Sequence, residues 1–369
     1  MTDELRRNYF DHNATTPTHP GVADFIRPFY TEFFGNPSSL HWAGRDVRAS
    51  FDAARAQVAS IIGAQPGEVV FTGCGSESDN HAVKGVASAC REKGNHIITT
   101  TVEHPAVLNA CRYLETKGYD VTYLPVDQEG RIKADDVAGA IRNDTILISV
   151  MYANNETGTL LPLREIGAIA RARGIILHSD MVQALGKVDI DVGLLNVDLA
   201  SFAGHKVYAP KGVGALYVKE GLKLDNLIHG GHQEGGRRAG TENILGALAF
   251  GKACEIVGRE MNRECARTEA LRKKLLEGIL ARIEDVRLNG HPGERLPNTL
   301  NLSFEYVEAE SLLVALDLEG IAVSSGSACS SGTAEPSHVL MAMHIPPETC
   351  QSAVRFSLGR GNTEEDIDY

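Results

Sequence analysis

The sequence has 369 residues, of which 43% are hydrophobic and 23% are charged, and its formal net charge is −12. This composition is typical of a globular protein, and the length favours a large domain with a smaller one beside it. The acidic balance repels phosphate backbones, and no apolar run approaches the ~18 residues of a membrane span. We therefore expect neither nucleic acid nor a membrane as a partner.

Short apolar runs alternate with amphipathic helical segments between about residues 50 and 220. The runs predicted to be strands are 68–72, 96–101, 119–125, 145–151 and 175–180. A helical segment follows each of the first two runs, and further helical segments lie before 145 and before 175. This alternation predicts an α/β fold with a mostly parallel sheet that is covered by helices.

The pattern changes after Thr241, where residues 241 to about 284 are predicted to form one long helix or two helices joined end to end. The later predicted elements are a strand at 299–304, a helix at 308–319 and short strands near 321–325 and 354–357. We therefore predict a large domain at 15–258. A smaller α+β domain would combine residues 1–14 with 259–369.

The two ends of the sequence and its cysteines support further expectations. The first residues mix acids with arginines and have no apolar centre, so we expect neither a signal peptide nor a transit peptide.

Seven scattered cysteines without CxxC spacing predict neither disulfides nor a zinc site, and a reducing cytoplasm is the expected location. Residues 362–365 have the pattern of a helix start, so we expect the final helix to be truncated.

The first candidate motif is FTGCGSESDN, residues 71–80. A strand is expected to run into a glycine turn, with Ser76 as the N-cap of the following helix. The first backbone amides of a helix can bind an anion, and glycines allow a phosphate to approach closely. An ordinary capped helix has the same pattern, so this motif alone does not decide between the two.

Asp180 and Lys206 are the next candidates. Asp180 ends an apolar strand, where ligands bind in α/β sheets, although it could also cap the next helix. Lys206, in SFAGHKVYAPKGVGALYV, is either a solvated surface charge or a desolvated amine that attacks an aldehyde. An anion site, an aspartate and such a lysine together suit a pocket for pyridoxal phosphate (PLP).

These motifs occur in order from YFDHNATT to VRFSLGRGNTEED, and the whole chain resembles the cysteine desulfurases of the NifS/IscS type. Those enzymes have the PLP fold-type I and belong to the class V aminotransferase superfamily. The resemblance implies a homodimeric enzyme with PLP as its cofactor and L-cysteine as its substrate. The products would be L-alanine and a protein-bound persulfide.

The resemblance also implies a role for each matching residue. Lys206 would hold the cofactor and remove the Cα proton, and His104 would stack on the ring and transfer protons. Arg355 would bind the substrate carboxylate, for which a two-pronged guanidinium is well suited. The other implied contacts are Asp180 at the pyridine nitrogen, Gln183 at the phenolic oxygen, Asn155 beside cofactor and substrate, Gly75, Ser76 and His205 at the phosphate, and Thr241 from the other subunit.

Cys329 lies in SSGSACSSG, a run of small residues within an expected loop at about 324–334. Small residues bury little surface and lose much entropy on ordering, so the composition predicts a mobile surface loop. The resemblance implies that Cys329 receives the sulfur and passes it to an acceptor such as an iron–sulfur cluster scaffold. No metal site is expected, apart from transient ligation of an iron–sulfur cluster by Cys329.

The sequence departs from the family pattern at position 203, and two alternative functions remain open. Ala203 stands where many members of this family have a phosphate-binding serine, and we expect Ser201 or a water to replace that hydrogen bond of about 1 kcal/mol. A selenocysteine lyase or a cystine lyase would share Lys206 and Asp180. A non-catalytic protein that kept the fold for binding is opposed by the intact Lys206, Asp180, His104 and Cys329.

Overall fold

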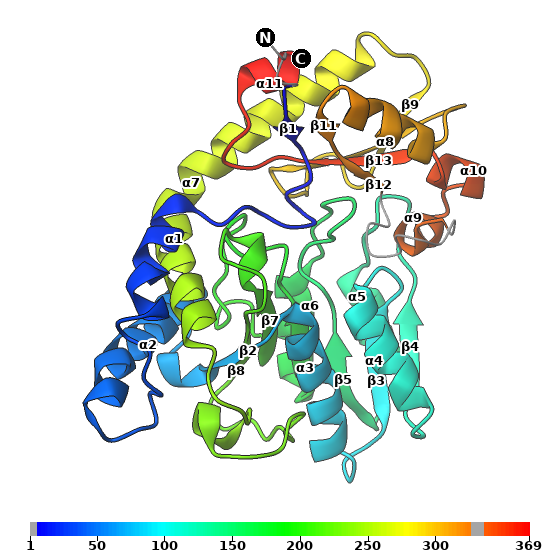
Figure 1. Cartoon of the computed structure of the whole chain (residues 1–369). Coiled ribbons are helices and arrows are strands. Elements are labelled where there is room, and N and C mark those ends of the chain that lie inside the picture. The colour runs from blue at the N-terminus through cyan, green and yellow to red at the C-terminus, as the bar shows by residue number, and fades with distance from the viewer. Residues whose placement is uncertain (1–5, 326–335) are drawn as a thin grey trace.

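A computed structural model describes residues 6–325 and 336–369 (Figure 1). Its largest sheet has seven strands in the order β2-β8-β7-β6-β5-β3-β4, and only the two pairs that involve β8 are antiparallel. The strands are β2 (Val69–Thr72), β3 (His96–Thr100), β4 (Asp120–Leu124), β5 (Thr145–Ser149), β6 (Ile176–Asp180), β7 (Leu199–Ala203) and β8 (Gly214–Val218). The predicted, mostly parallel sheet is confirmed.

Helices cover both faces of this sheet. Successive side chains of a strand point to opposite faces, so Ile97 packs in a core with α3 and α4, whereas Ile98 packs in a second core with α2, α6 and α7. Figure 1 shows the resulting layered arrangement. The helices before α7 are α1 (Pro20–Ile26), α2 (Trp42–Ile61), α3 (Gly75–Ala89), α4 (Pro105–Glu115), α5 (Ala134–Ala140) and α6 (Leu163–Arg173).

A single long helix, α7 (Ile244–Leu280), runs from the core that contains Ile98, α2 and α6, here called the main core, to a separate, smaller core (Figure 1). Its residues Phe250 and Val257 are buried in the main core, and Leu271 is buried in the smaller one. Residues 241–284 therefore contain one helix and not two. The domain boundary predicted after residue 258 falls within α7, and the division into domains stays a prediction.

The smaller core lies on an antiparallel sheet with the order β12-β13-β10-β9, and β1 pairs with β11 beside it. The strands are β1 (Asn8–Tyr9), β9 (Val286–Asn289), β10 (Thr299–Phe304), β11 (Ile321–Ala322), β12 (Ser324–Ser325) and β13 (Ala353–Ser357). The helices are α8 (Ala309–Leu318), α9 (His338–Ala342), α10 (Pro347–Cys350) and α11 (Glu364–Asp368). None of the helices in the described part of the chain has the length and apolarity that a membrane crossing requires.

Two glycines of α7 approach α2 at very different distances. A Cβ atom on Gly251 would lie 2.5 Å from the Cα of Ala54, which is backbone and cannot easily move aside. A Cβ on Gly258 would lie 3.6 Å from its nearest neighbour, the Cδ1 of Ile61, which is ordinary contact. The absence of a side chain at Gly251 therefore sets how closely α2 and α7 pack.

We expect Gly251→Ala to lower the thermal unfolding midpoint and its matched control Gly258→Ala to raise it. Both substitutions gain about 0.8–1 kcal/mol of helix propensity. Only the first forces α2 and α7 apart, and overpacking of this kind costs about 1–3 kcal/mol. Differential scanning calorimetry of the two variants would make the comparison, and midpoints that rise equally would contradict the close packing.

Candidate active site

A cavity of about 380 Å³ lies where the parallel strands end. In α/β sheets this edge collects the turns that follow the strands and the first amides of the helices, which together bind ligands. The walls come from the turns after β2, β6 and β7, the start of α4, residues 13–14, residues 151–155 and β13. The predicted residues that line it are Gly75, Ser76, His104, Asn155, Asp180, Gln183, His205, Lys206 and Arg355.

Two predicted residues are not among those that line the cavity. Thr241 is exposed on the single chain and lies just before α7, so its predicted contact with a second subunit stays a prediction. Cys329 lies outside the described residues, and its predicted role likewise stays a prediction.

Lys206 enters the cavity from a short 3₁₀ helix, η3 (Gly204–Lys206), directly after β7. Its Nζ donates hydrogen bonds to the main-chain oxygens of Asn13 at 2.5 Å and Ala14 at 2.7 Å. The amine is thereby held against the N-terminal segment. Sequence reasoning assigned no role to residues 13 and 14, because a main-chain oxygen carries no side-chain signature.

Asp180 and His104 face the same cavity. Burial raises the pKa of Asp180, whereas nearby His104 and Lys206 act in the opposite direction. Burial also lowers the pKa of His104. The Nδ1 atom of His104 accepts a hydrogen bond from the amide of Ala106, so the neutral ring carries its proton on Nε2. His104 therefore has a ring proton that it can donate.

Asp79 is a buried acid in this cavity to which the sequence assigned no role in the site. One ligand atom each from Asp79, His104 and Asp180 lies within 4.8 Å of the other two. Burial, followed by the charge of Asp180, raises the pKa of Asp79 well above its usual value. Its Oδ1 has no hydrogen-bond partner among the described residues. Because such a trio could also hold a metal ion, the expected absence of a metal site stays a prediction.

The start of α3 forms another wall of the cavity. A Cβ on Gly75 would lie 2.9 Å from the Cγ2 of Val182, so glycine keeps this turn closely packed. The prediction that Ser76 caps α3 is wrong, because the helix already begins at Gly75. The N-cap residue is Cys74, no side chain caps the helix, and the carboxylate of Glu77 accepts a hydrogen bond from the amide of Gly73 in the preceding turn. Ser76 is exposed and lines the cavity.

The expectation that Ser201 replaces the missing hydroxyl at Ala203 is not supported. The Oγ of Ser201 lies 3.0 Å from the Nε2 of His178, and Ser201 does not line the cavity. Ala203 does line it, beside Gly75. A different phosphate contact is available from His205, whose pKa burial lowers to about 4, so that its ring is neutral at pH 7.

Arg355 is a buried cation on β13, with only 2% of its surface exposed. Its Nη2 pairs with the Oδ1 of Asp11 at 2.8 Å, and its Nη1 donates to the main-chain oxygen of Asn155 at 3.1 Å. Its Nε has no partner among the described residues. A guanidinium that lines the cavity and is held in place in this way suits a carboxylate ligand.

The observed residues fit PLP. Lys206 supplies an amine for its aldehyde, and the acids Asp180 and Asp79 suit a protonated ring nitrogen because a cation would compensate their buried charge. The helix start at Gly75 leaves room and amides for a phosphate. Each of the three parts of the cofactor therefore has a matching group in one cavity.

Glu103, which precedes His104, is a buried acid that sequence reasoning missed. Its Oε1 accepts hydrogen bonds from the Oγ1 of Thr100 at 2.8 Å and the amide of Met151 at 2.9 Å. Its Oε2 has no partner among the described residues. Burial raises the pKa of Glu103 from 4.5 to about 8, so the folded protein holds this acid protonated at neutral pH.

Glu103→Gln is expected to stabilise the protein increasingly as the pH rises. The folded-state pKa lies above the unfolded value, so wild-type Glu103 costs stability between about pH 4.5 and 8, and glutamine removes that titration. The gain in unfolding free energy should grow by at most about 1.4 kcal/mol per pH unit and level off above pH 8. Urea unfolding over this range would measure it, with Glu92→Gln on the surface as the control. A gain that is constant with pH would contradict a protonated Glu103.

Comparison with known proteins identifies the family of this chain. The aminotransferase class-V family matches residues 8–369. Proteins named cysteine desulfurase IscS from Dictyoglomus turgidum and Methanosarcina thermophila are each 50% identical to the chain. The first alignment covers 99% of this chain and 92% of the relative, and the second covers 100% and 91%.

Solved structures agree with the sequence relatives. A NifS-like protein superimposes with a TM-score of 0.93 at 38% identity, covering 99% of this chain and 97% of its own. The structure described as SspA in complex with cysteine has a TM-score of 0.86 at 37% identity and covers 95% and 98%. The predicted PLP fold-type I is confirmed by these neighbours. The chain belongs to the class V aminotransferase family.

Proposed function

We propose that the chain is a cysteine desulfurase that uses PLP to convert L-cysteine into L-alanine and a persulfide on Cys329. The observation that carries this proposal is the meeting of Lys206, Asp180, His104 and Arg355 in one cavity. The name cysteine desulfurase of relatives that are 50% identical over nearly the whole chain supports the same reaction. These names favour it over a selenocysteine lyase, a cystine lyase or a non-catalytic binding protein.

The cofactor would be held by residues of the cavity. When bound, PLP withdraws electrons from the Cα of an amino acid that is linked to its aldehyde. Lys206 would bind the aldehyde and, once displaced by substrate, remove the Cα proton. Asp180 would accept a hydrogen bond from the ring nitrogen and keep it protonated. Gln183 would donate to the phenolic oxygen, with Asn155 beside cofactor and substrate, and Gly75, Ser76 and His205 would hold the phosphate.

Arg355 would orient the substrate through its carboxylate. Its place in the lining of the cavity and its fixed pairing with Asp11 support that role, because a guanidinium held in place can bind a carboxylate without further ordering. The substrate would then lie between Arg355 and Lys206, which line the same cavity. The amino and carboxyl groups of L-cysteine would each have one recognition point.

Cys329 would supply the nucleophile for sulfur transfer. Its thiolate would attack the sulfur of the substrate, forming the new S–S bond while the Cβ–S bond breaks. The electron pair of the broken bond stays with the substrate carbon, which takes up a proton to become the methyl group of L-alanine. His104, with its proton on Nε2, is the proposed acid or base at this thiol step.

The persulfide would pass to an acceptor protein, and an iron–sulfur cluster scaffold is the proposed acceptor. We also propose a cytoplasmic location, because a thiol that must remain reactive needs a reducing setting. All six cysteines in the described part of the chain are free thiols, which supports that setting.

Cys329→Ser and Lys206→Ala are expected to fail at different stages. The serine variant keeps the cavity, so it should bind PLP and change its visible spectrum with L-cysteine, yet make alanine and sulfide at under about 1% of the wild-type rate. Lys206→Ala should lose both turnover and the borohydride-reducible link to the cofactor. Spectra, alanine assays and mass spectrometry of the Cys329 peptide test this division. Full activity of the serine variant, or a persulfide found only on Cys74, would refute it.

The active unit is proposed to be a twofold homodimer in which Thr241 reaches the phosphate of the other subunit. The exposed position of Thr241 supports this, as do the large apolar side chains of Tyr30, Phe34, Leu40 and Trp42, each more than 60% exposed on the single chain. Sites that two subunits build together can be tested by mixing subunits that carry different defects.

Thr241→Ala is expected to weaken PLP binding about tenfold or more, because a hydrogen bond to a charged group is lost. Mixed dimers of Thr241→Ala with Lys206→Ala should regain one intact site, since one pocket then has both Lys206 and the partner's hydroxyl. PLP titration and sedimentation would measure this. A fully active monomer, or no recovery in mixed dimers of confirmed composition, would argue against a shared site.

A further inference from the structure

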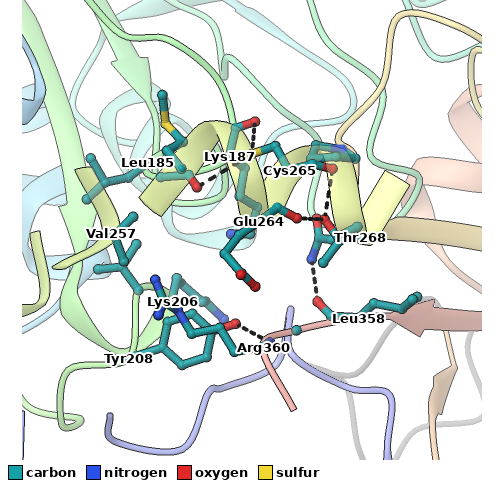
Figure 2. A pocket seen from close by; sticks show the side chains of 16 residues that line it. Leu185, Lys187, Lys206, Tyr208, Val257, Glu264, Cys265, Thr268, Leu358 and Arg360 are labelled. Carbon is teal, nitrogen blue, oxygen red and sulfur yellow. Dashed lines mark hydrogen bonds between the residues drawn. The ribbon is translucent and has the colours of Figure 1, made fainter. Parts of the chain in front are cut away.

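A second, smaller cavity of about 50 Å³ also has Lys206 in its lining (Figure 2). Its lining includes Lys187, Lys206, Cys265 and Arg360, and Figure 2 shows Lys187 close to Cys265. Lys187 has no role in the reaction proposed above. It is nevertheless a partly exposed cation next to the lysine that would hold the cofactor.

The chain after β6 forms one helical turn that aligns Lys187 with Gln183. The amides of Leu185 and Val188 bond to the carbonyls four residues earlier, at Met181 and Ala184. Residues four apart in such a turn lie on the same face. The Nζ of Lys187 accordingly donates to the main-chain oxygen of Gln183 at 3.1 Å and reaches its side-chain Oε1 at 3.5 Å.

This contact orients the amide of Gln183. A lysine amine carries hydrogens in both of its protonation states, so the amide presents its oxygen to Lys187 and turns its NH₂ group away. The Nε2 donates to the main-chain oxygen of Asn13 at 3.0 Å, the same oxygen that accepts from Lys206. Gln183 itself lines the larger cavity. The donor end of the amide is thus turned toward the site of Lys206.

We propose that Lys187 is a positioning residue for the reaction, which fixes the Gln183 amide with its N–H toward the phenolic oxygen of PLP. This inference rests on the proposed function and adds a residue to it. Without Lys187 only the contact with the Asn13 oxygen holds the amide in this orientation. A rotation by half a turn, which would turn the amide oxygen toward an oxygen of the cofactor, would then be opposed by one contact fewer.

The surroundings of Lys187 agree with a role next to Lys206. Burial, followed by the charge of Lys206, lowers the pKa of Lys187 to about 7, and Cys265 acts in the opposite direction. Glu264 lines the same small cavity, and the charge of Lys187 helps to lower the pKa of His12. The charge of Lys187 therefore interacts with Lys206, Cys265 and His12.

The test compares Lys187→Met with Lys187→Arg, Gln183→Ala and the double variant in the PLP-loaded enzyme. The readout is the pH midpoint of the visible absorbance change of bound PLP without substrate, together with kcat and KM. A donor to the phenolic oxygen competes with the proton shared between that oxygen and the Lys206 nitrogen, so its loss should raise the midpoint by about half a pH unit or more. Lys219→Met, on the exposed surface, is the control and should leave it unchanged.

Four results would support the inference: a raised midpoint in Lys187→Met, its restoration in Lys187→Arg, a similar rise in Gln183→Ala, and no further rise in the double variant. Should Lys187→Met fail to fold, Lys187→Leu removes the same hydrogen-bond donor. A shift that adds fully to that of Gln183→Ala would mean that Lys187 acts directly on Lys206 and would overturn the inference. An unchanged midpoint would also overturn it while PLP still binds, whereas a wild-type protein that binds no PLP would overturn the proposed function itself.

Discussion

Two hydrogen bonds from Lys206 to the main-chain oxygens of residues 13 and 14 join the edge of the large sheet to the N-terminal segment. That segment also forms β1, which pairs with β11 near the smaller sheet. Asp11 of the same segment pairs with Arg355 on β13. Because all these contacts are made by one short stretch of chain, its position determines how Lys206 and Arg355 face each other across the cavity.

Burial controls the charge of the cavity as much as its shape. It raises the pKa values of Asp79 and Asp180 and lowers those of His104 and His205, so each group is driven toward its neutral form. A protonated ring nitrogen in a ligand would compensate the buried negative charge of the acids. An anionic phosphate would likewise favour nearby hydrogen-bond donors and cations. The same site thus favours a zwitterionic cofactor over an apolar one, which connects the buried titratable groups to PLP chemistry.

Hydrophobic periodicity predicted the five strands of the large sheet that lie before residue 181, because buried parallel strands are continuous apolar runs. It gave no indication that the strand 214–218 is antiparallel, since a pattern of side chains carries no strand direction. It misjudged Ser76 as a cap, because the backbone already becomes helical at Gly75, which makes Cys74 the N-cap residue. Ser201 failed as a substitute for the same kind of reason, since His178 already engages its hydroxyl.

The sequence by itself determined the α/β class, the family resemblance and nine residues of the cavity, because strand ends and reactive side chains leave a signature in the order of residues. Only the tertiary structure brought in the carbonyls of residues 13 and 14, the buried acids Asp79 and Glu103, and the contact of Lys187 with Gln183. These features depend on burial and on distances between segments far apart in the chain. Local residue patterns do not encode either quantity, so the electrostatics of the site emerged only once the chain was folded.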